Sequence, residues 1–224
     1  AYHIVLSFSW EACMDANKRK AMQGRVKKTL DALERNGMNA VYVNDKNEAL
    51  KLVQSLVPEG AYTATGGSVT LRETGIMEYL QTKTDWHKEY RDAYNASFYL
   101  VSANAVTEHG ELYEVDGTSN RVSAMLYGPE KVIVVAGINK LVPDLRSAVV
   151  RVKTEAAPAN CVRLSYDTPC AKTGECAFPS FDECHLGALG CQTDGRICCG
   201  YVVFAKQKAK GRITVIIIGE DYGY

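Results

Sequence analysis

Thiol chemistry is the first function that the sequence suggests, because six of its eight cysteines lie in one short stretch near the C-terminus. Clustered thiols bind soft metals, carry out redox reactions or form disulfides. Their spacing here matches neither a zinc ribbon nor a ferredoxin, so metal binding, disulfide pairing and buried free thiols all remain open. The six residues are Cys170, Cys176, Cys184, Cys191, Cys198 and Cys199.

A glycine-rich turn, Gly66-Gly67-Ser68, is the second candidate for chemistry, because it falls where a predicted strand ends and a helix begins. Residues without a Cβ let a phosphate or carboxylate approach the backbone N–H groups at a helix N-terminus. Thr70 and Glu73 follow this turn. Glu73 is either a nucleophile or base that faces the ligand, or the partner of Thr70 in a helix capping box.

Polar residues also follow three other predicted strands, and the carboxyl ends of parallel strands form the ligand-binding edge of such sheets. Arginine can bind a carboxylate or phosphate through its two-pronged guanidinium. Around Asp116 and Ser119, turn formation and helix capping are the alternative. With Glu73 as the candidate catalytic group, the predicted ligand-binding residues are Gly66, Gly67, Ser68, Thr70, Asn104, Asn120, Arg121, Asn139 and Lys140.

The elements that must position these residues alternate between helix and strand along the chain. Short β-branched strands between helices predict an α/β fold with a largely parallel sheet covered by helices on both faces. A stretch rich in Pro, Gly and Cys at 165–200 interrupts this alternation and predicts a Cys-rich loop excursion near the C-terminus. The predicted helices are 16–36, 46–56, one after the glycine turn, 85–96, 120–127 and 143–155, and the strands are 39–43, 61–65, 98–102, 112–115, 131–136, 201–205 and 213–218.

The charge balance argues against two classes of partner. Lys and Arg total 26, as do Asp and Glu, so we expect neither nucleic acid nor an anionic membrane surface as a partner. No apolar run approaches the ~20 residues of a membrane-spanning helix. The first residues lack the basic segment and cleavage site of a signal peptide, so we expect a cytoplasmic protein with reduced thiols.

Several segments together resemble the LUD domain family of lactate-utilisation proteins. The resemblance extends from about residue 14 to the C-terminus and implies one domain at 14–224, with a Cys-rich insertion at 165–200 and an N-terminal extension at 1–13. It also implies the α/β sandwich of NagB, RpiA and the CoA transferases. The segments that carry it are Gly66–Gly75, Ser102–Thr107, Val115–Val122, Val135–Lys140, Thr168–Cys176 and Gly219–Gly223.

The resemblance implies an accessory or redox-linked component of lactate or 2-hydroxy-acid oxidation, with a small anionic ligand and iron–sulfur oxidoreductase subunits as partners. A homo-oligomer is a further option. The alternatives are a stand-alone enzyme related to CoA transferases or sugar-phosphate isomerases, and a non-catalytic carboxylate or phosphate sensor, so enzymatic activity stays open. The family pattern implies an iron–sulfur cluster or zinc on Cys170, Cys176, Cys191 and Cys198. Cys184 and Cys199 are additional to that pattern.

Overall fold

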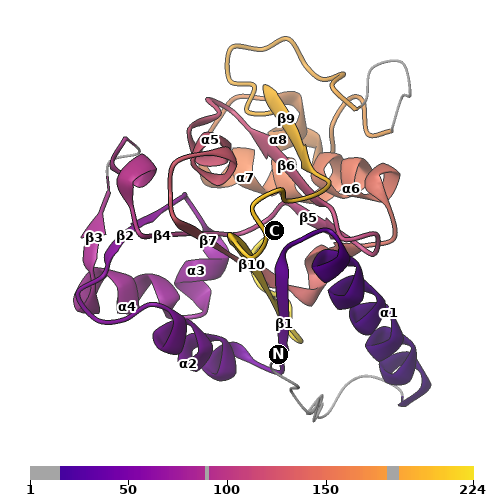
Figure 1. Ribbon diagram of the computed structural model, residues 1–224. Helices are drawn as coiled ribbons and strands as arrows, with labels where there is room; N and C mark the ends of the chain where they lie inside the picture. Colours follow the sequence, from indigo (N-terminus) through magenta and orange to yellow (C-terminus); the bar gives the residue numbers. More distant parts are fainter. Residues whose placement is uncertain (1–15, 89–90, 181–186) are drawn as a thin grey trace.

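A six-stranded, wholly parallel sheet forms the centre of the molecule (Figure 1). This computed structural model describes residues 16–88, 91–180 and 187–224. The predicted extension at 1–13 and Cys184 lie outside the described residues. In spatial order the strands are β1 (Asn39–Val43), β10 (Ile213–Ile218), β7 (Lys131–Gly137), β4 (Phe98–Val101), β2 (Tyr62–Thr65) and β3 (Asp85–His87).

Both faces of this sheet are buried, which explains why its strands are continuously hydrophobic. Val132 and Val134 pack on one face with α1 (Ala16–Arg35) and α5 (Asn120–Leu126). Their neighbours Ile133 and Val135 pack into the core on the other face. That second face is covered by α2 (Lys46–Leu56), α3 (Val69–Glu73) and α4 (Ile76–Lys83). The predicted α/β fold with a largely parallel, doubly covered sheet is therefore confirmed.

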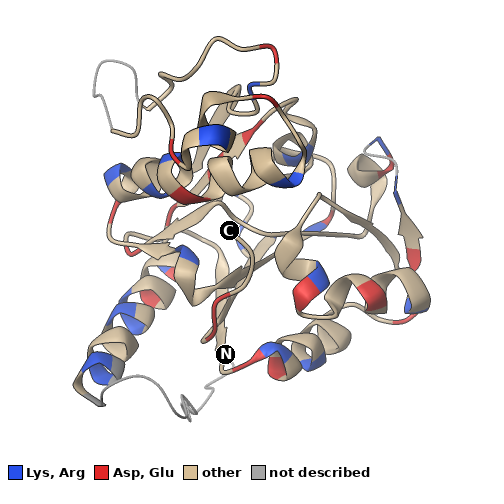
Figure 2. Cartoon of the chain, turned by 180° about the vertical axis from the view of Figure 1, so that it is seen from behind, with Lys and Arg blue, Asp and Glu red and all other residues tan. Residues whose placement is uncertain are grey.

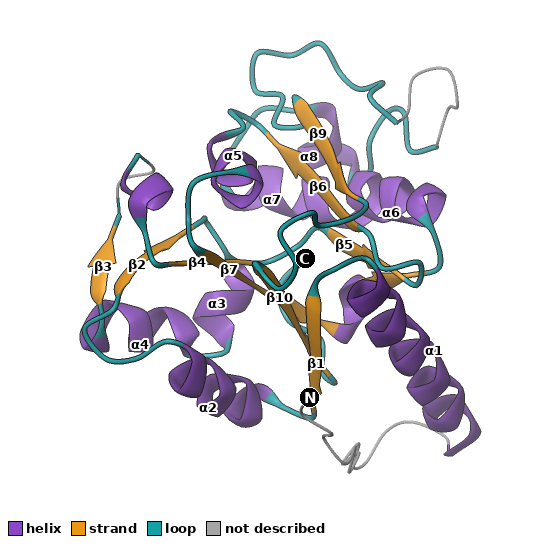
Figure 3. Cartoon of the chain, in the orientation of Figure 1, coloured by secondary structure: helices purple, strands orange, loops and turns teal. Residues whose placement is uncertain are grey.

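A second sheet of four strands packs over the first, on the same side as α1 and α5 (Figure 3). In it, β6 pairs antiparallel with both β5 and β9, whereas β5 and β8 are parallel. Hydrophobic periodicity predicts the strands at 112–115 and 201–205 but does not show which strands they pair with. It therefore could not predict that they belong to a second sheet. The strands are β8 (Leu141–Val142), β5 (Ala105–Thr107), β6 (Leu112–Asp116) and β9 (Gly200–Phe204).

Two of the predicted helices differ from the structure. The helix expected at 85–96 is wrong at its start, because Asp85–His87 pairs with β2 as an edge strand; in the described part of this range that follows, Asp92–Asn95 forms a 3₁₀ turn. The helix expected at 143–155 continues further along the chain. It consists of α6 (Leu145–Arg151), a π-helical turn (Val152–Ala156) and α7 (Ala157–Arg163). Pro158 has no backbone N–H, so one hydrogen bond of the helical backbone is missing near the π-helical turn, but the helix continues.

The Cys-rich segment between α7 and β9 is largely irregular, as predicted. Figure 3 shows it as a long loop beside β9. Its described part contains one short helix, α8 (Pro169–Thr173), which Thr168 caps by accepting a hydrogen bond from Ala171 N. Basic and acidic residues are interspersed along the outer helices (Figure 2). None of the described helices is both long and apolar enough to cross a membrane.

Candidate functional site

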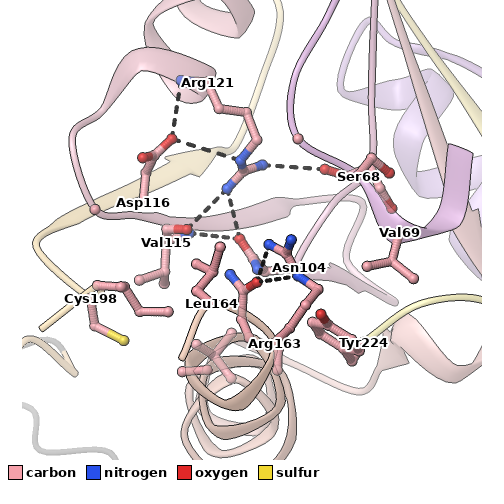
Figure 4. Close-up of a pocket in the computed structure, with 18 of the residues that line it drawn as sticks. Ser68, Val69, Asn104, Val115, Asp116, Arg121, Arg163, Leu164, Cys198 and Tyr224 are labelled. Carbon is pink, nitrogen blue, oxygen red and sulfur yellow. Dashed lines mark hydrogen bonds and ion pairs between the residues drawn. The ribbon is translucent and has the colours of Figure 1, made fainter. Parts of the chain in front are cut away.

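A cleft of about 400 Å³ lies at the carboxyl ends of β2, β4 and β7. The glycine turn follows β2, Ser102 follows β4, and Lys140 lies three residues beyond β7. The opposite wall comes from the end of α7 and the residue after it, and includes Arg163 and Leu164 (Figure 4). The cleft therefore occupies the edge at which parallel α/β sheets bind their ligands.

The structure brings most of the predicted ligand-binding residues together in this cleft. Gly66, Asn139 and the candidate catalytic residue Glu73 are not among the residues that line it. The predicted residues that do line the cleft are Gly67, Ser68, Thr70, Asn104, Asn120, Arg121 and Lys140.

Lys140 is the buried amine of the cleft. Its side chain is only 2% exposed, and Nζ donates to Ser102 Oγ at 2.9 Å and to Thr70 Oγ1 at 3.1 Å. Burial, followed by the charge of Arg151, lowers the pKa of Lys140 from 10.5 to about 7. A substantial fraction of this amine is therefore neutral near pH 7, and a neutral lysine can act as a base or a nucleophile.

Arg121 lines the cleft but uses its guanidinium to hold the surrounding protein. Nη1 lies 2.5 Å from Oε2 of the fully buried Glu114 and also donates to Ser102 O at 3.2 Å. Nη2 donates to Asn104 Oδ1 at 2.9 Å and to Val115 O at 3.0 Å. Burial raises the pKa of Glu114, and the charge of Arg121 opposes that shift. The fork predicted to bind a ligand is thus engaged by protein acceptors, so Arg121 fixes the floor of the cleft.

Asp116 organises the turn that leads into α5. Its Oδ1 accepts from the backbone N–H groups of Thr118 and Ser119, and its Oδ2 accepts from those of Arg121 and Val122. Ser119, with φ of 61°, makes no capping hydrogen bond through its side chain. The turn alternative considered for this segment is therefore present, with Asp116 rather than Ser119 as the capping side chain.

The two glycines of the turn have different roles. A Cβ on Gly66 would lie 2.8 Å from Arg121 Cγ and 2.9 Å from the Tyr99 hydroxyl, whereas a Cβ on Gly67 would meet nothing within 4 Å. Gly66 is therefore required for packing, and Gly67 leaves the backbone open towards the cleft. Ser68 is the N-cap of α3 and accepts from Leu71 N at 3.2 Å. Because α3 has only five residues, its dipole is small.

Glu73 and Asn139 hold the C-terminal segment of the sequence. Glu73 is exposed, and its Oε2 accepts from Gly223 N at 2.7 Å. Asn139 donates to Gly223 O at 3.0 Å and accepts from Tyr222 N at 3.2 Å. Thr70 donates to Tyr222 O at 3.2 Å, so the alternative capping box of Thr70 and Glu73 does not form. Lys140 therefore lines the cleft, whereas Glu73 lies outside its lining and holds the C-terminal segment.

Some cleft residues were not predicted from the sequence. Arg163 and Asn160 come from α7, which lies beyond the helix predicted at 143–155. The Tyr224 hydroxyl is buried and has no hydrogen-bond partner among the described residues. No carboxylate of the described residues forms an ion pair with Lys140 or Arg163. Arg163 and the protonated fraction of Lys140 thus carry positive charge in the cleft without a carboxylate ion-pair partner among these residues.

A second, smaller and mostly apolar cavity is lined by thiols; we call it the thiol cavity. Burial raises the pKa of Cys161 to about 11 and that of Cys198 to about 12, with further contributions from neighbouring thiols. These groups are therefore protonated and unreactive near pH 7. The cysteines that line the cavity are the four predicted metal ligands, Cys170, Cys176, Cys191 and Cys198, together with Cys161.

Cys161 and Cys170 are a pair of thiols whose spacing suits a metal ion. The Sγ atoms of Cys161 and Cys170 are 3.7 Å apart. Two thiolates in a tetrahedral zinc site with Zn–S bonds of about 2.3 Å lie about 3.8 Å apart. Among residues 16–88, 91–180 and 187–224, however, no group of three or more His, Cys, Asp or Glu side chains is placed to hold a metal ion. The described residues thus have the right chemistry for a soft metal but not an assembled ligand set.

The cleft and the thiol cavity share a wall. Four residues line both: Val152, Ala157, Ile197 and Cys198. Val152 belongs to the π-helical turn, and Cys198 lies at the margin of the cleft in Figure 4. A ligand in the cleft would therefore be separated from the other thiols by a single layer of side chains.

A doubly covered parallel sheet with a polar cleft at its carboxyl edge defines the α/β class, in which ligands bind at that edge. The model of the LUD domain family matches residues 26–218, so the chain belongs to the LUD domain family. Membership supports a lactate-utilisation-type protein. The resemblance identified from the sequence segments is thereby confirmed.

A solved structure described as a DUF162 family protein from Deinococcus radiodurans has a similar fold. The TM-score is 0.51 at 13% sequence identity, and the match covers 90% of this chain and 98% of that chain. At this identity the similarity concerns the fold alone. A search of curated proteins gave no match.

Proposed function

We propose that this protein binds a small organic acid in the cleft as a component of lactate or 2-hydroxy-acid oxidation. The observation that carries the proposal is the buried amine of Lys140, which lines the cleft between the hydroxyls of Ser102 and Thr70. An anion near Lys140 and Arg163 would supply the negative charge that neither receives in an ion pair with a described carboxylate. Membership of the LUD domain family supports the class of acid.

Gly67→Val tests the cleft as the binding site. Its side chain would project from the open backbone beside the ligand, so affinity should fall about tenfold or more, equivalent to about 1.4 kcal/mol. Gly24→Val is the matched control, because Gly24 is an exposed residue of α1 and its Cβ would also meet nothing within 4 Å. Calorimetric titration with lactate, pyruvate and inorganic phosphate measures the affinities.

Two results would contradict the proposal. Equal affinities in the Gly67→Val and Gly24→Val variants would place the ligand elsewhere. Binding of phosphate but of neither acid would make the cleft a phosphate site, as expected for the sugar-phosphate-isomerase alternative.

A redox-linked role is the second candidate, and the shared wall between cleft and thiol cavity favours it. In this hypothesis zinc or an iron–sulfur cluster binds to Cys170, Cys176, Cys191 and Cys198, with Cys161 adding a thiol beside Cys170. An iron–sulfur oxidoreductase subunit would then be the matching partner. When bound, a cluster would supply electron transfer and zinc a structural cross-link.

Anaerobic purification followed by metal analysis and optical absorption tests this second candidate. We expect bound metal in the wild type, a loss of metal in Cys170→Ser, and no change in Cys199→Ser, because Cys199 is exposed and does not line the cavity. A colourless, metal-free protein with its thiols intact would rule the candidate out.

A further inference from the structure

Lys140 is a buried lysine whose ammonium group has no carboxylate partner among the described residues. Its Nζ contacts two hydroxyls, those of Ser102 and Thr70, and it lines a cleft large enough for a small metabolite. The cationic Arg121 is close by, since it donates to the backbone carbonyl of Ser102. Arg151 donates to the carbonyl of Asn139, the residue before Lys140. Proteins activate some lysines as nucleophilic amines by burying them or placing them next to another cation.

We propose that Lys140 forms a reversible imine with the carbonyl carbon of a 2-oxo acid bound in the cleft. This inference rests on the proposed binding of an organic acid at the same site. Its consequence is that Lys140 acts as a covalent catalytic residue. The lowered pKa of Lys140 agrees with this role, because the attacking amine must be neutral.

The reaction is balanced without an oxidant or a metal. The lone pair of Nζ attacks the carbonyl carbon, and a proton moves from nitrogen to the carbonyl oxygen to give a carbinolamine. Loss of that hydroxyl with one further proton releases one water and leaves the C=N bond; hydrolysis reverses the sequence. The hydroxyls of Ser102 and Thr70, within hydrogen-bonding distance of Nζ, are placed to carry these protons.

A 2-oxo acid matches both the amine and the positive charge of the cleft. Its carbonyl is the electrophile for Lys140, and its carboxylate suits the remaining positive charge, including Arg163 on the opposite wall. A 2-oxo acid is also the product of oxidising a 2-hydroxy acid, the substrate class that the family supports. A 2-hydroxy acid has no ketone carbonyl, and the amine forms no imine with a carboxylate carbon, so it should bind only non-covalently in the same cleft.

Reductive trapping tests the proposal. The full-length protein is incubated with pyruvate and sodium cyanoborohydride, which reduces an imine to a stable secondary amine. We expect one adduct per chain, with the mass of pyruvic acid less one oxygen atom, and peptide mapping should locate it on Lys140. Lactate should give no adduct and should compete with pyruvate.

Variants separate Lys140 from the other lysines. Lys140→Arg and Lys140→Met should reduce trapping to the background of surface lysines. Lys153→Met is the matched control, because Lys153 is also buried, at 3% exposure, but lines the thiol cavity instead of the cleft; it should retain the wild-type adduct. Peptide mapping of the wild type gives the answer even if a Lys140 variant fails to fold.

The outcomes distinguish this inference from the proposed function. Pyruvate that binds, with binding weakened by Gly67→Val, but yields no adduct on Lys140 would overturn the imine and leave the binding site standing. Adducts confined to surface lysines would overturn it too. A failure of pyruvate and lactate to bind at all would remove both proposals.

Discussion

The cleft and the thiol cavity both bury nucleophilic side chains, yet burial has opposite chemical consequences in the two sites. Removing water disfavours the charged form of a group. In the cleft it lowers the pKa of Lys140 to about 7, so part of that amine is neutral, whereas in the cavity it raises the pKa of Cys161 and Cys198 and keeps those thiols protonated. The cleft thus presents a partly neutral amine near pH 7, whereas the thiols would need a cation to release their protons.

The two sites also differ in how they are built. The cleft lies at the ends of paired strands, and its floor is held by the hydrogen bonds of Arg121 to Glu114, Asn104, Val115 and Ser102. The thiol cavity lies between the π-helical turn, α7 and the irregular Cys-rich segment. We therefore expect substitutions in the floor of the cleft to cost more stability than substitutions in the cavity.

Arg121→Met should produce the largest loss of stability. It leaves Glu114 fully buried without its cation, and removing one partner of a buried ion pair costs about 3–5 kcal/mol. Arg163→Met is the control in the same cleft; Arg163 is exposed, so its replacement should change the free energy of unfolding by less than about 0.5 kcal/mol. Urea denaturation measures both. Equal effects would mean that the floor is not pre-organised by Arg121.

The next largest effect concerns Lys140 and pH. Its pKa is lowered from 10.5 to about 7, so between these values the unfolded chain binds more protons than the folded one. Stability contributed through Lys140 should therefore rise with pH across this window, by up to about 1.4 kcal/mol per pH unit. The charged groups that act on it are Arg151, Glu114, Arg121 and Glu73.

Lys140→Met isolates the pH-dependent stability that comes from Lys140, because every other titrating group is common to the wild type and the variant. The difference in unfolding free energy between wild type and variant, measured from pH 7 to pH 10, should change steadily in favour of the wild type. If the difference in unfolding free energy does not depend on pH, Lys140 has an ordinary pKa. Burial would then not make the amine in the cleft more reactive than the thiols in the cavity.

The neighbouring glycines give a smaller, local test. Gly66→Ala places a methyl group against Arg121 and Tyr99 and should cost about 1–3 kcal/mol through overpacking. Gly67→Ala enters open space and should change stability by less than about 0.5 kcal/mol while weakening ligand binding. Thermal unfolding and calorimetric titration separate the two effects. Loss of binding without loss of stability in Gly66→Ala would reverse the assigned roles.

Local sequence patterns predicted what depends on local structure. The helix at 16–36 and the strand at 39–43 agree with α1 and β1 to within a residue, because periodicity reports which face is buried. The position of the cleft could also be anticipated, since polar residues after parallel strands must share one edge. The strand partners in the second sheet could not be predicted, because antiparallel and parallel neighbours need the same hydrophobic residues.

What the sequence did not reveal are contacts between residues far apart along the chain. The catalytic role of Glu73 stays a prediction, but the structure shows that Glu73 contacts Gly223, and nothing in its own segment indicates where the chain returns. The guanidinium of Arg121 could bind an anionic ligand, yet in the structure it pairs with the buried Glu114. Cys161 was overlooked because it lies in α7, outside the Cys-rich stretch, although folding places it 3.7 Å from Cys170.

The smallest effect should come from the thiol cavity. If Cys161 packs as a small hydrophobic residue, Cys161→Ala should cost about 1 kcal/mol through the lost contacts of its sulfur, and Cys199→Ala, at an exposed position, close to nothing. Measured in the presence of a chelator, this difference reports packing alone. If Cys161 instead shares a metal with Cys170, added zinc should stabilise the wild type but not Cys161→Ala, since binding only to the folded state raises its stability. If zinc stabilises both proteins equally, Cys161 is not a zinc ligand. The thiol cavity would then be part of the packed core at Cys161, whereas the cleft is open to a ligand.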